Sequence, residues 1–289
     1  MSGAPEAPVD LLARTAALVT VASPSRAEGP LVEIIEDQLR VLPHLDVTRV
    51  GENLVARTNL GRPERLILAG HTDTVPANGN AEARIEAGCQ GTMRLRVVLR
   101  GERAHTARPW MGRNAVHRLA GLLSVLDSYT ERRPVIDGCE FREALQAVAV
   151  EGGVAGNVVP DEVVLTLNHR FAPDRDLAQA EGHVREVLAP FLEPDDVVEV
   201  VDAAPAAAPG LSHPLLAAVT SLSGGVISAK LGWTDVARFA AHGVPAVNFG
   251  PGDSTIAHTA HEHLDRAPLE RVWAVLETLL REGPDAGRG

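Results

Sequence analysis

The chain of 289 residues is 45% hydrophobic and 22% charged, the usual balance of a soluble globular protein. Its formal net charge of −11 argues against nucleic acid or an anionic membrane as a partner, because both attract basic surfaces. Two cysteines, Cys89 and Cys139, do not make a disulfide framework, and the amino terminus lacks the basic segment and uninterrupted apolar run of a signal peptide or membrane span. The chain therefore fits a reducing cytoplasm and is long enough for two domains.

The first part of the chain combines helical and strand patterns. Apolar side chains recur at helical spacing between Asp10 and about Leu42. Two strands are predicted next, Leu45 to Arg57 and Arg65 to Gly70, with a Gly/Pro-containing turn between them. The second of these contains the apolar run Leu66-Ile67-Leu68-Ala69, which predicts a buried strand.

A histidine and an aspartate directly follow this predicted strand. His71 and Asp73 are two residues apart, so on an extended chain their side chains point to the same side. A carboxylate there can accept a hydrogen bond from one imidazole nitrogen and leave the other nitrogen for a metal ion. The pair predicts a metal site, and a simple turn before Pro76 is the alternative.

From Thr92 onward, strands and helices alternate in a regular order. The pattern predicts strand, helix, strand, strand, helix and strand over Met93–Leu99, Gly112–Tyr129, Ala144–Val150, Glu162–Arg170, Leu177–Leu192 and Val197–Val201. This order matches a self-contained ferredoxin-like unit. The alanine- and proline-rich stretch from Ala203 to Gly210 then predicts a linker, and an amphipathic helix is predicted from Leu269 to Arg281.

A second set of metal-ligand side chains lies near the carboxyl end. The apolar segment Ala246–Phe249 runs into a Gly/Pro turn, and a cluster follows that consists of His258, His261, Glu262 and His263. Imidazole nitrogen and carboxylate oxygen together suit zinc. The cluster predicts at least one metal ligand, and a polar, solvated loop is the alternative.

Several segments, in order along nearly the whole chain, resemble the motifs of a known family. These are the co-catalytic zinc hydrolases that include aminoacylases, desuccinylases and carboxypeptidases. The segments are Gly70–Pro76, Arg103–Pro109 with Gly112–Ala115, Asn157–Glu162 with Asn168–Arg170, and Ala257–Thr259 with Glu262. Gly88–Thr92 and Gly232–Phe239 are similar to the actinobacterial desuccinylase branch in particular.

The resemblance implies an α/β fold of two domains. A zinc-hydrolase-type α/β catalytic domain with a truncated sheet would comprise residues 1–89 and 206–289. A ferredoxin-like βαββαβ dimerisation or lid domain, residues 90–205, would interrupt it. A homodimer is also implied, as is the hydrolysis of N-succinyl-LL-2,6-diaminopimelate to succinate and LL-diaminopimelate in lysine biosynthesis.

The resemblance assigns roles to individual residues. His71 would bind one of two zinc ions and His258 the other, while Asp73 would orient an imidazole ring. His105 would reach into the partner subunit's site and stabilise an oxyanion, a role that a preorganised donor can fill. Guanidinium groups bind carboxylates bidentately. The residues implied in substrate binding are Asn157, Arg170, Thr234 and Arg238.

The segment that carries the family's other metal ligands has no counterpart in this sequence. The family has there a bridging aspartate, a Glu-Glu pair that includes the general base, and a further carboxylate ligand. Between Ala77 and Ala87 the only acids are Glu82 and Glu86. The chain therefore resembles a family member with an internal piece removed near residues 85–87, which would also leave an unpaired sheet edge.

Three interpretations follow from this gap. The first is a desuccinylase that holds a single zinc ion on His71, Asp73 and His258. The second is a catalytically inactive dimeric protein that still binds carboxylates. The third is an amidase that acts on another N-acyl amino acid.

Overall fold

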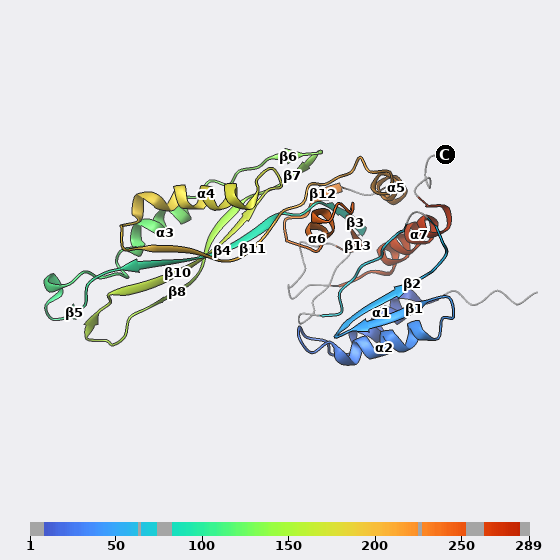
Figure 1. Ribbon diagram of the computed structural model, residues 1–289, viewed down its shortest axis with the longest axis horizontal. Helices are drawn as coiled ribbons and strands as arrows, with labels where there is room; N and C mark the ends of the chain where they lie inside the picture. The colour runs from blue at the N-terminus through green and yellow to red at the C-terminus, as the bar shows by residue number, and fades with distance from the viewer. Residues whose placement is uncertain (1–8, 63–64, 74–82, 225–226, 253–262, 284–289) are drawn as a thin grey trace, which may run out of the picture. The chain divides into compact units, whose positions relative to one another are not determined.

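The computed structural model describes residues 9–62, 65–73, 83–224, 227–252 and 263–283 (Figure 1). The chain forms two compact units. The first comprises residues 1–84, 221–224 and 249–289, and the second comprises residues 85–220 and 225–248. The assignment of a catalytic and a dimerisation domain with boundaries at 89/90 and 205/206 stays a prediction.

The amino- and carboxyl-terminal helices of the first unit lie against each other. α1 (Leu11–Val19) begins at Asp10, whose carboxylate accepts a hydrogen bond from the Ala13 N–H at 3.0 Å and so caps the helix. The same carboxylate pairs with Arg266 at 2.9 Å, at the start of α7 (Arg266–Glu282). This ion pair joins segments that are far apart in sequence, and α7 confirms the predicted amphipathic helix.

A helix and a β-hairpin complete the regular structure described in this unit. The helical spacing between Asp10 and Leu42 is divided by a turn, and its second part forms α2 (Gly29–Arg40). The segment predicted as one strand from Leu45 is a hairpin of β1 (Asp46–Val50) and β2 (Asn53–Arg57). Gly51 at its turn has φ +61°, a conformation that side chains with a Cβ atom rarely adopt.

The predicted strand from Arg65 to Gly70 is wrong. Residues 65–73 have no regular secondary structure, and Ile67 and Leu68 are 59% and 56% exposed. An apolar run becomes a buried strand only where neighbouring strands pair with it and other elements cover it. The sequence lacks the segment expected to supply those neighbours, so within the described ranges this run has no strand to pair with.

Substitution of Ile67 tests this exposure. We expect Ile67→Asp to change the free energy of unfolding by less than about 0.5 kcal/mol, as is usual for surface positions. Ile85→Asp places a charge at a position that is 1% exposed and is expected to cost about 3 kcal/mol or more. Urea unfolding followed by circular dichroism compares the two variants. A loss of several kcal/mol for Ile67→Asp would show that the run is buried.

The second unit is built on a four-stranded antiparallel sheet. Its strands lie in the order β11 (Val197–Ala204), β4 (Gly91–Arg100), β10 (Glu162–Phe171) and β8 (Ala144–Gly152). With α3 (Leu119–Asp127) and α4 (Leu177–Leu188), the chain order is the predicted β-α-β-β-α-β. Figure 1 shows the two helices on the same face of the sheet.

The two faces of this sheet differ in their side chains. Met93, Leu95, Val97 and Leu99 of β4 are buried and pack with α3 and α4 in the main core. The alternate residues of the same strand include Thr92, Arg94 and Arg96, which face the other side. Among the predicted site residues of the second unit, Arg170 lies on this helix-free face, opposite Thr92.

α3 is shorter than the helix predicted from Gly112 to Tyr129. The side chain of Asn114 accepts hydrogen bonds from the N–H groups of Val116 and His117, at 2.9 and 3.2 Å. Asparagine often closes such turns with its own side chain and so competes with helix formation. The helix therefore begins only at Leu119.

The stretch predicted as a linker is part of the folded unit. Ala203 and Ala204 end β11, and Ala207 is buried and pairs with Cys89 through two backbone hydrogen bonds of 3.0 and 2.9 Å. The small alanine side chain allows this close packing. The prediction of a linker from Ala203 to Gly210 is therefore wrong.

A parallel strand pair lies close to this bridge. β3 (Ala83–Ala87) pairs with β12 (Ile227–Ala229), and Lys230, the chain's single lysine, binds the carboxylate of Glu86 at 2.5 Å. The remaining elements are β5 (Ala104–His105), β6 (Val135–Ile136), β7 (Cys139–Glu140), β9 (Val158–Val159), α5 (Pro214–Ser223), α6 (Val236–Ala241), β13 (Asn248–Pro251) and the 3-10 turns Pro109–Met111 and Ala189–Phe191. Within the described ranges, none of the helices combines the length and hydrophobicity needed to cross a bilayer.

A buried carboxylate holds three segments of the second unit together. Glu143, just before β8, is fully buried and accepts hydrogen bonds from Arg132 at 2.6 Å, Arg175 at 2.8 Å and the Ala172 N–H at 3.0 Å. Arg132 also binds Asp174 through two hydrogen bonds of 2.6 and 2.7 Å. A buried charge with this many partners is satisfied, and it fixes the start of α4 against the sheet.

Candidate functional site

In the first unit, His71 and Asp73 face each other. Nδ1 of His71 lies 2.9 Å from Oδ1 of Asp73, and the Ser25 hydroxyl donates to Oδ2 of Asp73 at 2.6 Å. The Ser25 hydrogen bond, together with the contact to His71, outweighs partial burial and holds the pKa of Asp73 below its ordinary value. The Asp73 side chain is therefore held as a carboxylate beside the imidazole ring.

The fit of this pair to a metal ion is partial. With Nδ1 engaged by Asp73, Nε2 is the ring nitrogen left for another partner, and the His71 side chain is 83% exposed. A metal-bound histidine commonly has such a carboxylate behind it. In the part of the chain that the structure describes, however, no three His, Cys, Asp or Glu side chains group closely enough to hold a metal ion. The described residues offer one ligand and do not fit a two-metal centre.

His258 lies outside the described residues. The prediction that it supplies the second histidine ligand, opposite His71, therefore stays a prediction. The same holds for the neighbouring His261 and Glu262.

In the second unit, His105 and Asn157 lie together at one end. His105 of β5 is opposite Val158 of β9, and the Thr106 N–H donates to the carbonyl oxygen of Asn157 at 3.0 Å. Nδ1 of His105 accepts a hydrogen bond from the Ala107 N–H at 3.0 Å. A neutral imidazole that accepts at Nδ1 carries its proton on Nε2. His105 thus presents an exposed N–H donor, the group that can stabilise an oxyanion.

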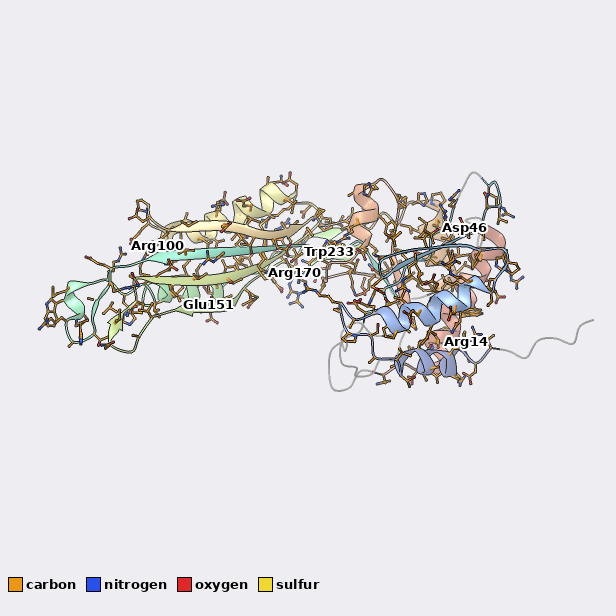
Figure 2. The ribbon with its side chains drawn as sticks, turned by 60° about the horizontal axis from the view of Figure 1, so that its bottom comes forward. Arg14, Asp46, Arg100, Glu151, Arg170 and Trp233 are labelled. Atoms are coloured by element: carbon orange, nitrogen blue, oxygen red, sulfur yellow. The ribbon has the colours of Figure 1, made fainter. Side chains whose placement is uncertain are left out.

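Arg170 lies near the other end of β10, opposite Thr92 of β4 (Figure 2). Its Nε donates to Oδ1 of Asn168 at 3.0 Å, and among the described residues no carboxylate forms an ion pair with it. Partial burial, and to a lesser extent the charge of Arg94, lower its pKa, although a guanidinium stays charged at neutral pH. A half-buried cation without an acidic partner favours an anionic ligand.

Thr234 lies just before α6 (Val236–Ala241), and Arg238 lies within that helix. The guanidinium of Arg238 lies over the indole ring of Trp233, 5.3 Å from the ring centre. Trp233 and Arg238 line a cavity of about 470 Å³ together with Thr92, the residue opposite Arg170. The buried hydroxyl of Thr234 has no hydrogen-bond partner in the described part of the chain. The cavity therefore adjoins the Arg170 end of the sheet.

The predicted site residues of the second unit thus form two groups at opposite ends of β10. His105 and Asn157 lie at the β5–β9 pair, close to the start of β10, and Arg170 lies near its finish, where Arg238 lines the adjoining cavity. The ten residues of β10 span roughly 30 Å at about 3.3 Å per residue. One small molecule cannot touch both groups of a single chain. They can act on one ligand only if they come from two chains.

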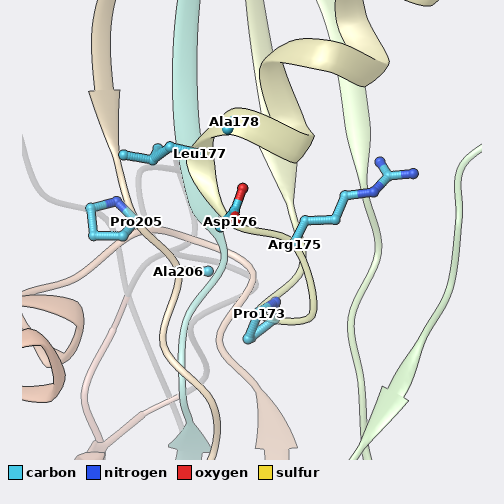
Figure 3. Close-up of a pocket in the computed structure, with 7 residues that line it drawn as sticks. All are labelled: Pro173, Arg175, Asp176, Leu177, Ala178, Pro205 and Ala206. Carbon is cyan, nitrogen blue, oxygen red and sulfur yellow. The ribbon is translucent and has the colours of Figure 1, made fainter.

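A second cavity, of about 470 Å³, lies at the start of α4 (Figure 3). Asp176 caps this helix through a hydrogen bond from the Gln179 N–H at 2.7 Å. Arg175 binds the buried Glu143, and Figure 3 shows its guanidinium turned away from the other lining residues. The charged side chains that line this cavity are thus already engaged in the fold.

Sequence reasoning missed several side chains around these sites. Trp233 and Thr92 lie within motif segments, so their positions were available, but nothing in the pattern linked them to Arg238 or Arg170. Asp202 also lines the Arg238 cavity, and Ser25 binds Asp73. Neither residue could be identified from the sequence, because each is far along the chain from the residues that it meets in the folded structure.

Comparison with known proteins agrees with the family resemblance of the sequence motifs. Residues 88–196 match the family model described as "Peptidase dimerisation domain". The chain is 38% identical to a protein named putative succinyl-diaminopimelate desuccinylase DapE from Mycobacterium tuberculosis, over 95% of this chain and 97% of the relative. It is 35% identical to a succinyl-diaminopimelate desuccinylase from Corynebacterium glutamicum, over 94% and 96%.

The alignment with the mycobacterial relative also shows an internal difference. It extends over 352 positions, whereas this chain has 289 residues, so at least 63 positions of the relative have no counterpart here. The match reaches almost both ends of each protein, so these positions are gaps within the alignment. This agrees with the absence of the family's carboxylate-bearing segment.

Solved structures share the fold. A tripeptidase from Staphylococcus aureus matches with a TM-score of 0.51 at 20% identity, over 69% of this chain and 53% of that one. An M20 family metallo-carboxypeptidase from Sulfolobus solfataricus matches with a TM-score of 0.51 at 13% identity, over 72% and 62%. The chain therefore spans little more than half the length of the solved structures that it matches.

Proposed function

Because the chain belongs to the succinyl-diaminopimelate desuccinylase family of metal-dependent M20 amidohydrolases, we propose that it binds N-succinyl-LL-2,6-diaminopimelate and hydrolyses its succinyl amide. The observation that carries this proposal is the match to desuccinylases over nearly the whole chain. The products would be succinate and LL-diaminopimelate, a step of lysine biosynthesis. Two free, buried cysteines support a reducing, cytoplasmic setting.

The chemistry of the second unit supports recognition of a polycarboxylate. Arg170 has no acidic partner among the described residues, and Arg238 lines a cavity that adjoins it. Guanidinium groups bind carboxylates through charge-assisted hydrogen bonds. We assign the substrate's carboxylates to these two arginines, with the Thr234 hydroxyl as a further donor.

A homodimer would complete this site. His105 and Asn157 lie a strand's length from Arg170, so in our proposal they serve the site of the partner subunit. There, the Nε2–H of His105 would donate to the amide oxygen as negative charge develops on it. The dimerisation-domain match supports this arrangement.

A divalent metal ion belongs to this family's chemistry, and we propose zinc. His71, oriented by Asp73, is the described residue that would hold it, with His258 as a further ligand. A bound zinc ion supplies a nucleophile at neutral pH and polarises the carbonyl. The missing glutamate base should slow hydrolysis by about 10²- to 10⁴-fold relative to a full-length relative.

Direct assay tests the proposal. The purified chain, loaded with zinc, is incubated with N-succinyl-LL-2,6-diaminopimelate, and the release of succinate is followed. We expect slow turnover that a chelator abolishes and that added zinc restores. Turnover that persists with chelator, or faster cleavage of other N-acyl amino acids, would contradict the proposal.

A second candidate function is binding without catalysis. The gap of at least 63 positions favours this candidate. By the resemblance, the missing segment is the one that would carry the bridging aspartate and the general base. This candidate predicts a dimer that binds the substrate, holds little zinc and releases no succinate. Zinc content measured per subunit, beside the assay above, separates the two.

Mixed dimers test whether the two groups of residues act across subunits. We expect His105→Ala and Arg170→Ala each to reduce turnover strongly when present alone. When the two variants are co-expressed, half of the randomly formed dimers contain one intact site, so roughly a quarter of the normal turnover should return. Coupled succinate release measures this recovery. No recovery would show that both residues act within one chain or that neither contacts the substrate.

A further inference from the structure

The cavity beside Trp233 carries groups of both charges. Its lining residues include the cationic Arg238, the anionic Asp202 and the polar Thr92. None of the N–H groups of the Arg238 guanidinium makes a hydrogen bond within the described residues; its ion-pair contact there is to Asp235 at 3.3 Å. Asp202 is half-exposed and pairs loosely with Arg94, at 3.4 Å. Both charges are therefore accessible to a ligand.

The position of Asp202 depends on an irregularity in β11. Val200 pairs with Leu95 on the buried face of β4, but the next paired residue is Asp202, opposite Arg94, so Val201 is an extra residue. With a regular register, Asp202 would lie opposite Met93 and point into the core. A β-bulge re-aims side chains in this way and is common beside active sites. The bulge delivers the carboxylate to the helix-free face.

Trp233 and Arg238, which both line this cavity, contact each other. The indole Nε1–H donates to the carbonyl oxygen of Pro205 at 3.2 Å, and the ring packs beside the cluster of Cys89, Ala207, Val236 and Ala237. The Arg238 guanidinium lies over the face of this fixed indole ring. A cation above an aromatic ring is attracted electrostatically, so Trp233 restricts the positions that the long arginine side chain adopts.

From this arrangement we infer that the cavity binds a zwitterionic α-amino-acid head group. The ligand's carboxylate pairs with Arg238, its ammonium joins Asp202, and Trp233 is a positioning residue for Arg238. The cavity volume of about 470 Å³ admits such a group. The inference rests on the proposed function in one respect: the unacylated end of N-succinyl-LL-2,6-diaminopimelate is the amino-acid end that would occupy the cavity.

Two ligands of equal chain length test the inference without any turnover. LL-2,6-diaminopimelate carries amino-acid head groups, whereas pimelate carries the carboxylates without ammonium groups. Isothermal titration calorimetry in the presence of chelator gives the affinity for each. We expect Asp202→Asn to weaken binding of diaminopimelate about fivefold, the scale of an exposed charge pair, and to leave pimelate unchanged.

Matched variants complete the design. Glu199→Gln removes a carboxylate from the same strand, opposite Arg96, and is expected to leave both affinities unchanged. Trp233→Leu should weaken both ligands through Arg238, and Trp233→Phe, which retains an aromatic face, should recover most of that loss. An equal effect of Asp202→Asn on both ligands, no effect on either, or no binding of either ligand to the normal chain would overturn the inference.

These outcomes are separate from those of the proposed function. A chain that releases no succinate but shows the selective loss with Asp202→Asn would retain the amino-acid subsite and refute hydrolysis. The other outcome is a chain that hydrolyses the substrate and whose affinity ratio between diaminopimelate and pimelate is the same in the normal protein and in Asp202→Asn. That result would refute the subsite and leave the proposed hydrolysis standing.

Discussion

Inserting the internal segment that the mycobacterial relative has, at the gap predicted near residues 85–87, is expected to raise succinate release by about 10²- to 10⁴-fold. The resemblance predicts that the general-base glutamate of the family is missing here, and proton transfer by a positioned group contributes a factor of this size. The inserted carboxylates would also complete the metal ligands that the described residues do not supply. Steady-state turnover with zinc, before and after the insertion, measures the effect.

The control for this insertion separates chemistry from folding. In a matched variant, the aspartates and glutamates of the inserted segment are replaced by asparagine and glutamine. This variant should restore any missing strands but not the ligands or the base, so its turnover should stay low. Unchanged turnover in the acidic insertion, or equal gains in both, would show that missing carboxylates are not the reason for slow hydrolysis.

Glu143→Gln is expected to lower the free energy of unfolding by about 3 kcal/mol. Removing one member of a buried ion pair leaves a buried charge without compensation, which costs about 3–5 kcal/mol. Arg132 keeps Asp174 in this variant, whereas Arg175 loses its ion-pair partner among the described residues, so the lower end of that range applies. Urea unfolding at neutral pH measures the loss.

Glu140→Gln is the matched control. Glu140 lies three residues earlier in β7, is exposed, and pairs with Arg133 at a long 3.8 Å. Its removal should change the free energy of unfolding by less than about 0.5 kcal/mol. Equal effects of the two substitutions would contradict the role given to the buried carboxylate.

The buried carboxylate of Glu143 also makes the stability of the fold depend on pH. Burial alone would raise the pKa of Glu143, but the hydrogen bonds from Arg132 and the Ala172 N–H, with the charge of Arg175, hold it below its ordinary value of 4.5. A group with a lowered pKa stabilises the fold fully above its ordinary value, and that contribution is lost as the pH falls through the folded value. The normal chain should therefore lose stability below pH 4.5 more steeply than Glu143→Gln does.

The regular sheet of the second unit was predictable because each strand carries its own pattern. Over much of β4 and β10, buried side chains alternate with less buried ones, and the helices α3 and α4 have ordinary helical spacing. The run from Leu66 to Ala69 shows where this reasoning fails. Its composition is that of a buried strand, yet strand formation depends on neighbouring strands, and none pairs with this run among the residues that the structure describes.

Some of the functional side chains could likewise be predicted from the sequence, and others could not. His71, His105, Arg170 and Arg238 were identified from motif segments. The spacing of two residues also paired His71 with Asp73, whereas the contact of Arg238 with Trp233 is known only from the structure. The bulge that turns Asp202 onto the helix-free face could not be predicted, since one extra residue in β11 leaves no mark in the pattern of alternation. The separation of His105 from Arg170 follows from the length of β10, which was predicted almost to the residue, and from the pairing of β5 with β9 near its start, which was not predicted.

The central claim is that the second unit recognises the substrate's carboxylates independently of any metal ion. Calorimetric titration of the chain with N-succinyl-LL-2,6-diaminopimelate, in the presence of chelator, tests it most directly. We predict that the normal chain binds and that Arg170→Ala weakens binding by about 10- to 100-fold, the scale of a lost charge-assisted hydrogen bond. No binding by the normal chain, or equal affinity in the Arg170→Ala variant, would contradict the account.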